Sequence, residues 1–327
     1  MYKLGIIGIG TIGSLYQQAL QSLSHLFSIT AVCDLNLSEE TPLPPAAQYR
    51  DYRQMLQCAD LDCVIISTPI DSHISIARDC LEAGKHVLLE KPAALDPEQI
   101  KALYLLAERK CLVFHVGFHA AFGLDLLWYL EHQQALGANW QIDRPAKIRC
   151  LFADPYIEKG KIDPRKLHLG GSYVDSGINA LSVCARLLPG ETFRIRGHRV
   201  RQSEGNTVYH SLTELDCKDI SITIETAWNL GRSHKSTLLE FPDAIGQILL
   251  DHTAQQVVRI FPDGSRKVLF QSDPENRLPS QYVGVFREFA DLLQGGAPSH
   301  TRQQVLHIHE LLSPEHLIAA ASIPSTV

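Results

Sequence analysis

The stretch Gly8-Ile9-Gly10-Thr11-Ile12-Gly13 follows the apolar run Leu4–Ile9 and precedes a helical pattern over about 11–24. It has the form GxGxxG, in which glycines allow a tight turn to bring backbone N–H groups and a helix N-terminus up to a pyrophosphate. The stretch therefore predicts a dinucleotide-binding turn between a strand and a helix. The cofactor-binding residues expected from it are Gly8, Gly10, Thr11, Ile12 and Gly13.

Asp34 ends the next predicted strand, Ile29–Asp34, twenty-one residues after Gly13. A carboxylate at this point can accept hydrogen bonds from the ribose diol of an adenosine. The sequence has no Lys or Arg between Lys3 and Arg50 that could hold the 2′-phosphate of NADP, and Asp34 would repel that phosphate. The predicted cofactor is NAD, and NADP is less favoured.

Residues 3 to about 117 alternate short apolar runs with helical stretches, which is typical of a doubly wound parallel sheet in the α/β class, here a Rossmann domain. We assign residues 1–120 to this NAD-binding domain. The other predicted strands are Val64–Thr68, His86–Leu89 and Leu112–Val116, and the other predicted helices span about 51–58, 71–83 and 96–110.

After residue 145 the pattern changes to longer alternating segments such as Ile220–Glu225, which is typical of antiparallel strands with one solvated face. Asp263-Gly264 predicts a hairpin between Val257–Phe261 and Lys267–Phe270. Residues 121–327 are therefore assigned to a substrate-binding and oligomerisation domain. It ends with helices over about 281–294 and 302–321, and the C-terminal helix could pack back on the first domain.

The composition excludes several classes of protein. The net charge of −6 and the lack of a Lys/Arg cluster argue against a nucleic-acid partner, and no apolar run is long enough to cross a membrane. The N-terminus lacks the features of a signal peptide, so we expect a cytoplasmic protein. The eight cysteines form no CxxC pair and are expected to be free, reduced thiols.

Three further segments carry a resemblance to a known family: Ser67-Thr68-Pro69-Ile70-Asp71-Ser72-His73, Glu90-Lys91-Pro92, and Gly170 to Asn179 with the sequence GGSYVDSGIN. With the glycine turn, they resemble the glucose-fructose oxidoreductase and inositol dehydrogenase family (Gfo/Idh/MocA). This resemblance implies a Rossmann domain followed by an α/β domain with a large, mainly antiparallel sheet, and a homodimer or homotetramer. It also implies cofactor contacts from Ser67, Thr68, Pro69, His73, Glu90 and Lys91.

The same resemblance implies that Lys91 is the lysine of the catalytic site and that Asp175 and Asn179 face the nicotinamide. Asn179 stands where the family usually has His, and Ser182 replaces a following Asp. Asn179 cannot titrate, so it would orient a substrate hydroxyl, and either Asp175 or a Lys91 of depressed pKa would take the proton. A hemiacetal hydroxyl is more acidic than an ordinary alcohol, which suits C1 of an aldose.

A narrower resemblance is to bacterial aldose 1-dehydrogenases that act on L-arabinose and D-galactose. It rests on the segment Asp175 to Ser182, followed by Leu187-Leu188-Pro189. It implies that His119 and Trp228 touch the sugar. Those enzymes have an acidic residue in the first strand of the second domain; here Asp154, next to Ala153, is its substitute and a predicted substrate contact.

Structural roles remain open for these residues. Lys91 could be a surface residue, Asp175 could cap the helix predicted over Ser176–Leu188, and His119 and Trp228 could be packing residues. We predict no metal site, because His307 and His309, which with His316 suggest one, are two positions apart and do not share a helix face.

Three functions are consistent with the sequence. The leading interpretation is an NAD-dependent dehydrogenase that oxidises C1 of an aldose to the lactone. A second is oxidation of a ring polyol, or reduction of a keto or imine group. A third is a non-catalytic dinucleotide sensor that has kept the fold and lost the chemistry.

Overall fold

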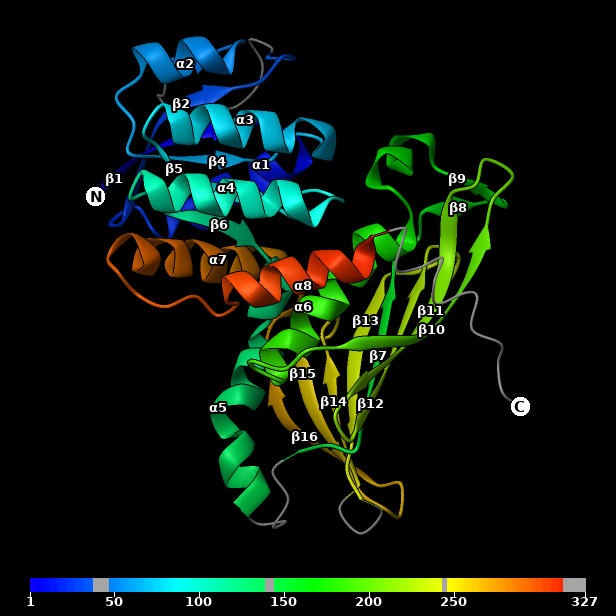
Figure 1. Cartoon of the computed structure of the whole chain (residues 1–327). Helices are drawn as coiled ribbons and strands as arrows, with labels where there is room; N and C mark the ends of the chain where they lie inside the picture. Colours follow the sequence, from blue (N-terminus) through cyan, green and yellow to red (C-terminus); the bar gives the residue numbers. More distant parts are fainter. Residues whose placement is uncertain (38–46, 139–143, 243–245, 314–327) are drawn as a thin grey trace. The chain divides into compact units, whose positions relative to one another are not determined.

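The computed structural model describes residues 1–37, 47–138, 144–242 and 246–313. These residues divide into two compact units (Figure 1). Unit 1 consists of Met1–His119 and Leu278–Leu306, and unit 2 consists of Ala120–Arg277 and the chain from His307.

Unit 1 contains a six-stranded parallel sheet in the order β3-β2-β1-β4-β5-β6. The central strands are buried on both faces, as expected when helices cover a parallel sheet on each side. The strands are β1 (Tyr2–Ile7), β2 (Phe27–Cys33), β3 (Ala47–Tyr49), β4 (Cys63–Ile66), β5 (His86–Glu90) and β6 (Phe114–Gly117). The helices are α1 (Thr11–Gln21), α2 (Tyr52–Cys58), α3 (Ile70–Glu82), α4 (Pro97–Arg109) and α7 (Arg277–Leu293).

Helix α7 comes from the end of the chain and packs into unit 1. Its Phe286 lies edge-on to Tyr16 of α1, with ring centroids 5.2 Å apart, and its Phe289 stacks on Phe27 of β2 at 6.4 Å. A buried ion pair joins His115 of β6 to Glu288 at 2.8 Å. These contacts explain why a helix predicted from its apolar periodicity belongs to the first unit.

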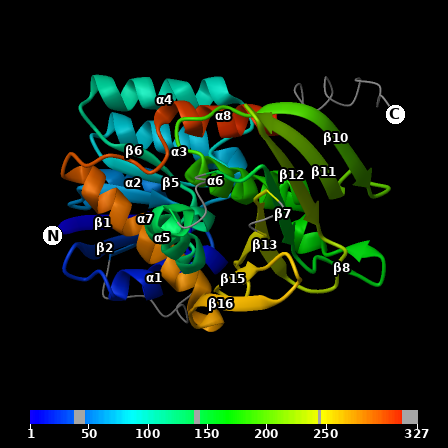
Figure 2. The same cartoon turned by 90° about the horizontal axis from the view of Figure 1, so that it is seen from below.

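Unit 2 is built on an eight-stranded sheet in the order β10-β11-β12-β7-β13-β14-β15-β16, in which only β12 and β7 pair in parallel (Figure 2). Buried residues alternate with exposed or partly buried ones along most of β7 and with partly buried ones along most of β12. The strands are β7 (Lys147–Ala153), β10 (Arg194–Gln202), β11 (Val208–Cys217), β12 (Ile220–Ala227), β13 (His234–Glu240), β14 (Gln247–Asp251), β15 (Gln256–Ile260) and β16 (Arg266–Gln271).

Helices cover the sheet of unit 2, with α5 on strands β14 to β16 and α6 on β7. The helices are α5 (Leu124–Ala138) and α6 (Ile178–Leu187), while α8 (Arg302–Leu312) contributes residues to both units. The short elements are β8 (Ile157–Glu158), β9 (Lys161–Ile162), and the helical turns η1 (His119–Phe122), η2 (Pro164–Leu169), η3 (Tyr173–Gly177) and η4 (Pro274–Asn276).

The predicted fold class, a Rossmann domain followed by an α/β domain with a large, mainly antiparallel sheet, is confirmed. The hairpin at Asp263-Gly264 forms between β15 and β16. Strand β1 starts and ends two residues earlier than predicted, and it ends at Ile7 because Gly8, at φ +89°, turns the chain out of the sheet. Residues 314–321 of the predicted last helix, and His316 with them, lie outside the described residues.

Asp175 does not cap α6, a structural alternative that the sequence left open. Tyr173–Gly177 already forms a π-helical turn, so Asp175 lies inside a helical segment and its N–H donates to the carbonyl oxygen of Gly171 at 3.0 Å. Gly177 is the residue before α6. The helical turn Tyr173–Gly177, which precedes α6, depends on Gly171. The φ of +98° at Gly171 and its close approach to the carbonyl oxygen of Val208 exclude a larger residue there.

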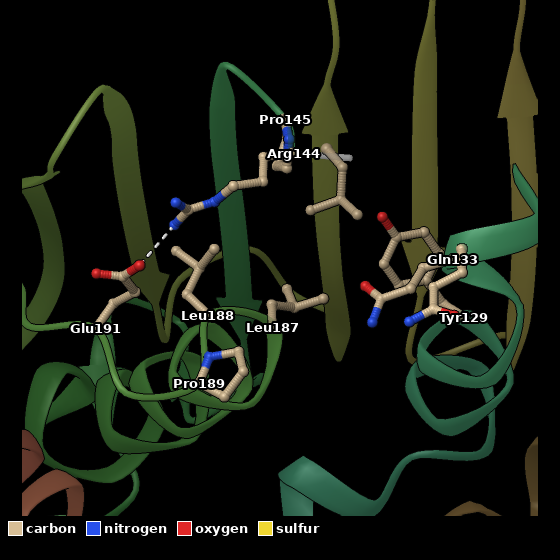
Figure 3. Close-up of a pocket in the computed structure, with 10 residues that line it drawn as sticks. Tyr129, Gln133, Arg144, Pro145, Leu187, Leu188, Pro189 and Glu191 are labelled. Atoms are coloured by element: carbon tan, nitrogen blue, oxygen red, sulfur yellow. Dashed lines mark hydrogen bonds and ion pairs between the residues drawn. The ribbon is translucent and has the colours of Figure 1, made fainter. Parts of the chain in front are cut away.

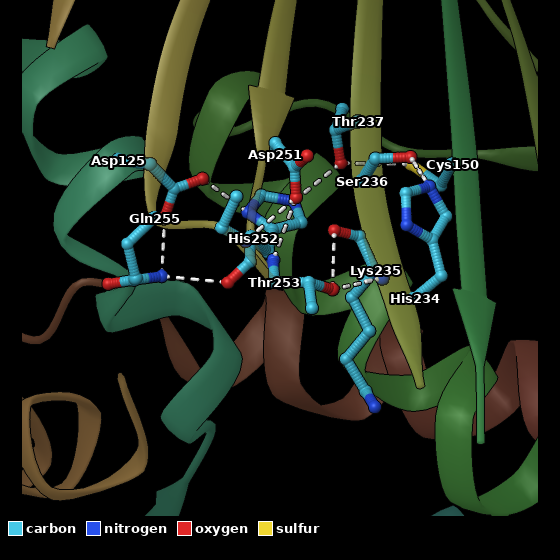
Figure 4. Close-up of polar contacts among 11 residues, drawn as sticks. Asp125, Cys150, His234, Lys235, Ser236, Thr237, Asp251, His252, Thr253 and Gln255 are labelled. Atoms are coloured by element: carbon cyan, nitrogen blue, oxygen red, sulfur yellow. Dashed lines mark hydrogen bonds and ion pairs between the residues drawn. The ribbon is translucent and has the colours of Figure 1, made fainter. Parts of the chain in front are cut away.

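Asp125, His252 and Thr237 form a buried polar chain in unit 2 (Figure 4). His252 Nδ1 lies 2.6 Å from Asp125 Oδ2, and Nε2 lies 2.8 Å from Thr237 Oγ1. A hydroxyl, an imidazole and a carboxylate follow one another here as they do in a Ser-His-Asp triad. Thr237 is completely buried, however, so no substrate can reach its hydroxyl. The chain therefore joins α5 to β13.

Candidate active site

The glycine turn of unit 1 is shaped by a close approach between two loops. A Cβ atom on Gly8 would lie 2.8 Å from the carbonyl carbon and oxygen of Ser67, and Ser67 Oγ donates to the carbonyl oxygen of Gly8 at 2.7 Å. A Cβ atom on Gly10 would meet no described atom within 4 Å. Gly10 also precedes α1, and no side chain of the described residues caps that helix. The turn therefore presents uncapped N–H groups beside open space, which fits a pyrophosphate.

Asp34 follows β2 and is tied to the glycine turn. Its Oδ2 accepts from the N–H of Ile9 at 2.9 Å, and its Oδ1 accepts from the N–H of Asn36 at 2.8 Å. Each carboxylate oxygen has two lone pairs, so each can accept one more hydrogen bond. The fixed carboxylate fits the ribose diol of NAD, as the sequence predicts.

Ser67, Thr68 and Pro69 form the loop between β4 and α3, and His73 lies on α3 behind it. The imidazole of His73 is buried, with Nε2 2.7 Å from the carbonyl oxygen of Thr68 and Nδ1 3.0 Å from that of Pro92. Burial lowers the pKa of His73, while the carbonyl oxygens act in the opposite direction. A neutral imidazole has one N–H, so His73 donates to one of these carbonyl oxygens and contacts the other. His73 thus lies between the two loops, and the loop after β4 carries predicted cofactor contacts.

Glu90 and Lys91 lie at the carboxyl end of β5. Glu90 is 8% exposed, accepts a hydrogen bond from the Tyr16 hydroxyl, and accepts the N–H of Lys91 at 3.0 Å. Burial raises the pKa of Glu90, and hydrogen bonds from Tyr16 and Tyr282 and the charge of Lys91 partly offset it. Lys91 is half-buried at the start of the loop that follows. Glu90 thus anchors the backbone that carries Lys91.

Two tyrosines, Tyr282 and Tyr16, connect His119 to Glu90. The ring of His119 lies 5.2 Å from that of Tyr282, which is edge-on to Tyr16 at 5.0 Å. Unit 1 therefore brings together three predicted residues, Glu90, Lys91 and His119. Sequence reasoning missed both tyrosines, since Tyr282 comes from a distant helix and neither belongs to a recognisable motif.

In unit 2, Asp175 and Asn179 are one helical turn apart, as predicted. The side-chain amide of Asn179 donates to the carbonyl oxygen of Asp175 at 3.2 Å. Asn179 is 7% exposed, and its Oδ1 is buried and accepts no hydrogen bond from the described residues. Ser182, at the other departure from the family pattern, donates to the carbonyl oxygen of Asn179 at 2.7 Å. Asn179 therefore offers an acceptor atom that the described chain does not use.

Asp154 follows β7 and is surrounded by donors. Its Oδ1 lies 2.5 Å from Nζ of Lys235, and its Oδ2 accepts from Ser176 Oγ at 3.3 Å. Burial lowers the pKa of Lys235, and the carboxylates of Asp154 and Asp175 partly offset this. Ser176 is next to Asp175 in the chain, so the structure brings together Asp154 and the turn that carries Asp175. Figure 4 shows Lys235 extending from β13.

Trp228 follows β12 and is completely buried. Its ring lies 5.3 Å from that of Tyr156 in an edge-on arrangement, and its Nε1 has no hydrogen-bond partner among the described residues. Burial lowers the pKa of Arg277, an effect that Asp154 and Tyr156 oppose. The group of polar side chains thus includes Tyr156, Lys235 and Arg277, which sequence reasoning missed because they come from separate segments without a shared spacing.

Unit 2 also contains a cavity of about 540 Å³, which is lined by residues other than these polar side chains (Figure 3). It is lined by residues such as Tyr129, Leu187 and Leu239, and by the ion pair between Arg144 and Glu191 at 3.0 Å. None of the predicted site residues lines it. We therefore place the candidate chemistry at the polar groups described above, because size alone does not indicate chemical function.

The described residues contain no group of three or more His, Cys, Asp or Glu side chains that could hold a metal ion. His307 Nε2 accepts the N–H of Phe193 at 2.9 Å, and His309 is completely buried.

All eight cysteines are free. In the part of the chain that is described, no helix is both long enough and apolar enough to span a membrane.

Comparison with known proteins identifies the first domain. Residues 2–118 match the model of the Gfo/Idh/MocA family, described as an oxidoreductase family with an NAD-binding Rossmann fold, and this domain belongs to that family. The predicted resemblance is thereby confirmed for residues 2–118, and the segment Gly170 to Asn179 lies outside the matched residues.

The individual relatives match this chain at low sequence identity and over only part of its length. The chain is 24% identical over 225 residues to the uncharacterised oxidoreductase YrbE of Bacillus subtilis, covering 68% of this chain and 63% of the relative. It is 31% identical over 161 residues to UDP-N-acetylglucosamine 3-dehydrogenase of Acidithiobacillus ferrooxidans, covering 48% and 50%. The matched parts thus span between half and two thirds of these relatives.

A solved structure resembles the whole fold. The structure of GenD2 from gentamicin A biosynthesis, in complex with NAD, superimposes with a TM-score of 0.80 at 18% identity, covering 98% of this chain and 94% of that one. At this level of identity the match establishes the fold.

Proposed function

We propose that the protein is an NAD-dependent dehydrogenase that oxidises a hydroxyl group of a sugar or sugar-like polyol. The observation that carries the proposal is the group of polar side chains in unit 2, where Asp154 and Asn179 keep acceptor positions that the described residues do not fill. A molecule with several hydroxyl groups would supply donors to them. The glycine turn and Asp34 support NAD as the cofactor, which would supply the hydride acceptor when bound.

Side chains of this protein would accept the proton of the substrate hydroxyl group and orient that group. Asp175 and Lys91 are the two candidates to accept it, as the family resemblance implies. Asn179 cannot titrate and would orient the hydroxyl through its amide. His119 would contact the sugar, as the narrower resemblance implies. Trp228 is completely buried against Tyr156, so it would support the site from behind and not touch the sugar.

The finer proposal is oxidation of an aldose at C1 to give the lactone. It is supported by Asn179, which the chain shares with the aldose 1-dehydrogenases, and by the acidity of a hemiacetal hydroxyl, which needs a weaker base. A second candidate is a hydroxyl on a sugar ring. The name of the relative UDP-N-acetylglucosamine 3-dehydrogenase favours it.

We also propose that the enzyme works as a cytoplasmic homodimer or homotetramer. The half-exposed large sheet supports this, because β10 has a mostly exposed surface that a second copy could cover. Light scattering of the purified protein and cell fractionation test the two parts of this proposal.

A substrate screen tests the function. Aldoses, inositols, glycosides and UDP-sugars are each incubated with the protein and either NAD or NADP, and formation of the reduced cofactor is followed by absorbance. We expect NAD reduction with an aldose, with the lactone as product by NMR. Oxidation of a ring hydroxyl alone would replace the finer proposal. NADH binding without turnover on any substrate, in either direction, would favour a dinucleotide sensor and contradict the enzyme proposal.

A further inference from the structure

Lys235 has all of its donors occupied. Its Nζ lies 2.5 Å from Asp154 Oδ1, 3.0 Å from Ser233 Oγ and 3.4 Å from the carbonyl oxygen of Ala153. An ammonium group has three protons, so these three acceptors use its hydrogen-bonding capacity. Its side chain is 11% exposed. Lys235 therefore has no donor left for a substrate and can influence one only through its partners.

Asp154 retains one acceptor position. Lys235 and Ser233 Oγ, at 3.5 Å, fill both lone pairs of Oδ1, whereas Oδ2 accepts only from Ser176 Oγ among the hydrogen bonds of the described residues. Ser176 belongs to the turn that carries Asp175. The open position on Oδ2 thus lies beside a residue already assigned to the reaction.

Lys235 is the cation in direct contact with this carboxylate. The side chain of Asp154 is 14% exposed, and a carboxylate removed from water favours protonation unless an opposite charge lies near it. Lys235 supplies that charge at contact distance. The other charged or titratable groups acting on the pair are Asp175, Arg277 and Tyr156. Of these, Asp175 carries the same charge as Asp154, and Arg277 carries the opposite charge.

We infer that Lys235 is a positioning residue that holds Asp154 ionised and oriented, so that its Oδ2 accepts a hydrogen bond from a substrate hydroxyl. This inference rests on the proposed function. It assigns substrate recognition in unit 2 to an Asp-Lys pair, with Asp154 as the contact and Lys235 acting only through it.

Steady-state kinetics across pH test the inference with the variants Lys235→Met, Lys235→Arg, Asp154→Asn and the double variant Asp154→Asn/Lys235→Met. We expect Lys235→Met to raise KM at least about tenfold, because a charge-assisted hydrogen bond is lost, and to change kcat less than about threefold. The acid limb of kcat/KM should move to higher pH. Lys235→Arg should restore most of the wild-type KM, and the double variant should be no worse than Asp154→Asn.

Lys218→Met is the matched control. Lys218 is paired with Glu191 at 2.9 Å in the same unit, but its own side chain is exposed and the pair includes none of the site residues. The control should leave KM and the acid limb unchanged. An unchanged KM and acid limb in Lys235→Met, or additive effects in the double variant, would overturn the inference.

A readout without turnover separates this inference from the proposed function. Protonation of Asp154 is followed by ¹³C NMR of its carboxyl carbon in wild type and in Lys235→Met, with circular dichroism confirming the fold of each. We expect the titration to move to higher pH in Lys235→Met and to stay near its wild-type position in Lys235→Arg. If the titration does not move, the inference is wrong whether or not the enzyme proposal holds. If it moves but no polyol is oxidised by the wild type, the proposed function fails instead.

Discussion

The imidazole of His73 lies with Nε2 2.7 Å from the carbonyl oxygen of Thr68 and Nδ1 3.0 Å from that of Pro92. It thus joins the loop after β4 to the loop that carries Lys91. We predict that His73→Phe raises the Kd for NADH about tenfold, because the hydrogen bond to one loop and the polar contact with the other are lost. Fluorescence titration measures this. As a control, His132→Phe removes a similar hydrogen bond, to the Trp128 carbonyl in unit 2, and should leave the Kd unchanged. Equal NADH affinity in His73→Phe would contradict the role.

Gly8 and Gly10 should respond differently to a methyl group. In Gly8→Ala the new Cβ meets the Ser67 backbone at 2.8 Å and the residue is held at φ +89°, so we expect a lower melting temperature. In Gly10→Ala the Cβ meets no described atom within 4 Å, so the stability of the free protein should change by less than about 0.5 kcal/mol. Its Kd for NAD should nevertheless rise at least about tenfold, because the methyl group takes the space of the pyrophosphate. Unchanged NAD binding by Gly10→Ala would place the cofactor elsewhere.

Asp34 should set the preference for NAD over NADP. We predict a higher kcat/KM with NAD, and a shift toward NADP in Asp34→Ser/Leu35→Arg, which removes the repelling carboxylate and adds a phosphate donor. Leu35 is 80% exposed, so an arginine there has room to reach solvent. Asp34→Ser alone separates the two effects, since it should weaken NAD without creating a phosphate contact. Equal efficiency of the wild type with both cofactors would contradict the prediction.

His198 should make unit 2 sensitive to acid. Burial lowers its pKa from an ordinary value near 6.5 to about 4. The unfolded chain therefore binds more protons between these values, and the free energy of unfolding falls as pH decreases from about 6.5 to about 4. The difference corresponds to about 3 kcal/mol. Urea unfolding across this range should show a smaller loss in His198→Gln than in wild type, and parallel curves would rule out the assignment.

The sequence predicts unit 1 more closely than unit 2 because its signals are local. Gly8, Gly10 and Asp34 belong to a motif whose spacing reflects one strand-turn-helix unit, and the alternation of apolar runs and helices gives the parallel sheet. The large sheet was predicted as a class, but the parallel pairing of β7 with β12 was not, since pairing across some seventy residues leaves no local pattern.

In the candidate site, too, only the residues that belong to local sequence motifs could be predicted. Lys91, Asp175 and Asn179 could be identified from short motifs, whereas Lys235 reaches Asp154 from eighty-one residues away. The sequence left open whether Asp175 caps α6, because the helical turn Tyr173–Gly177 depends on how Gly171 packs against Val208. A contact of this kind exists only once the sheet has formed.

The turnover of Lys91→Met tests the account most directly, because Lys91 is the residue that the family resemblance places in the reaction. We predict that kcat on the best substrate falls by roughly two orders of magnitude, since a positioned proton-transfer or orienting group is lost. The Kd for NADH should stay within about threefold of wild type. Lys101→Met, which removes an exposed lysine paired with Glu98 in the same unit, should retain full turnover. A Lys91→Met enzyme with normal kcat would contradict the account.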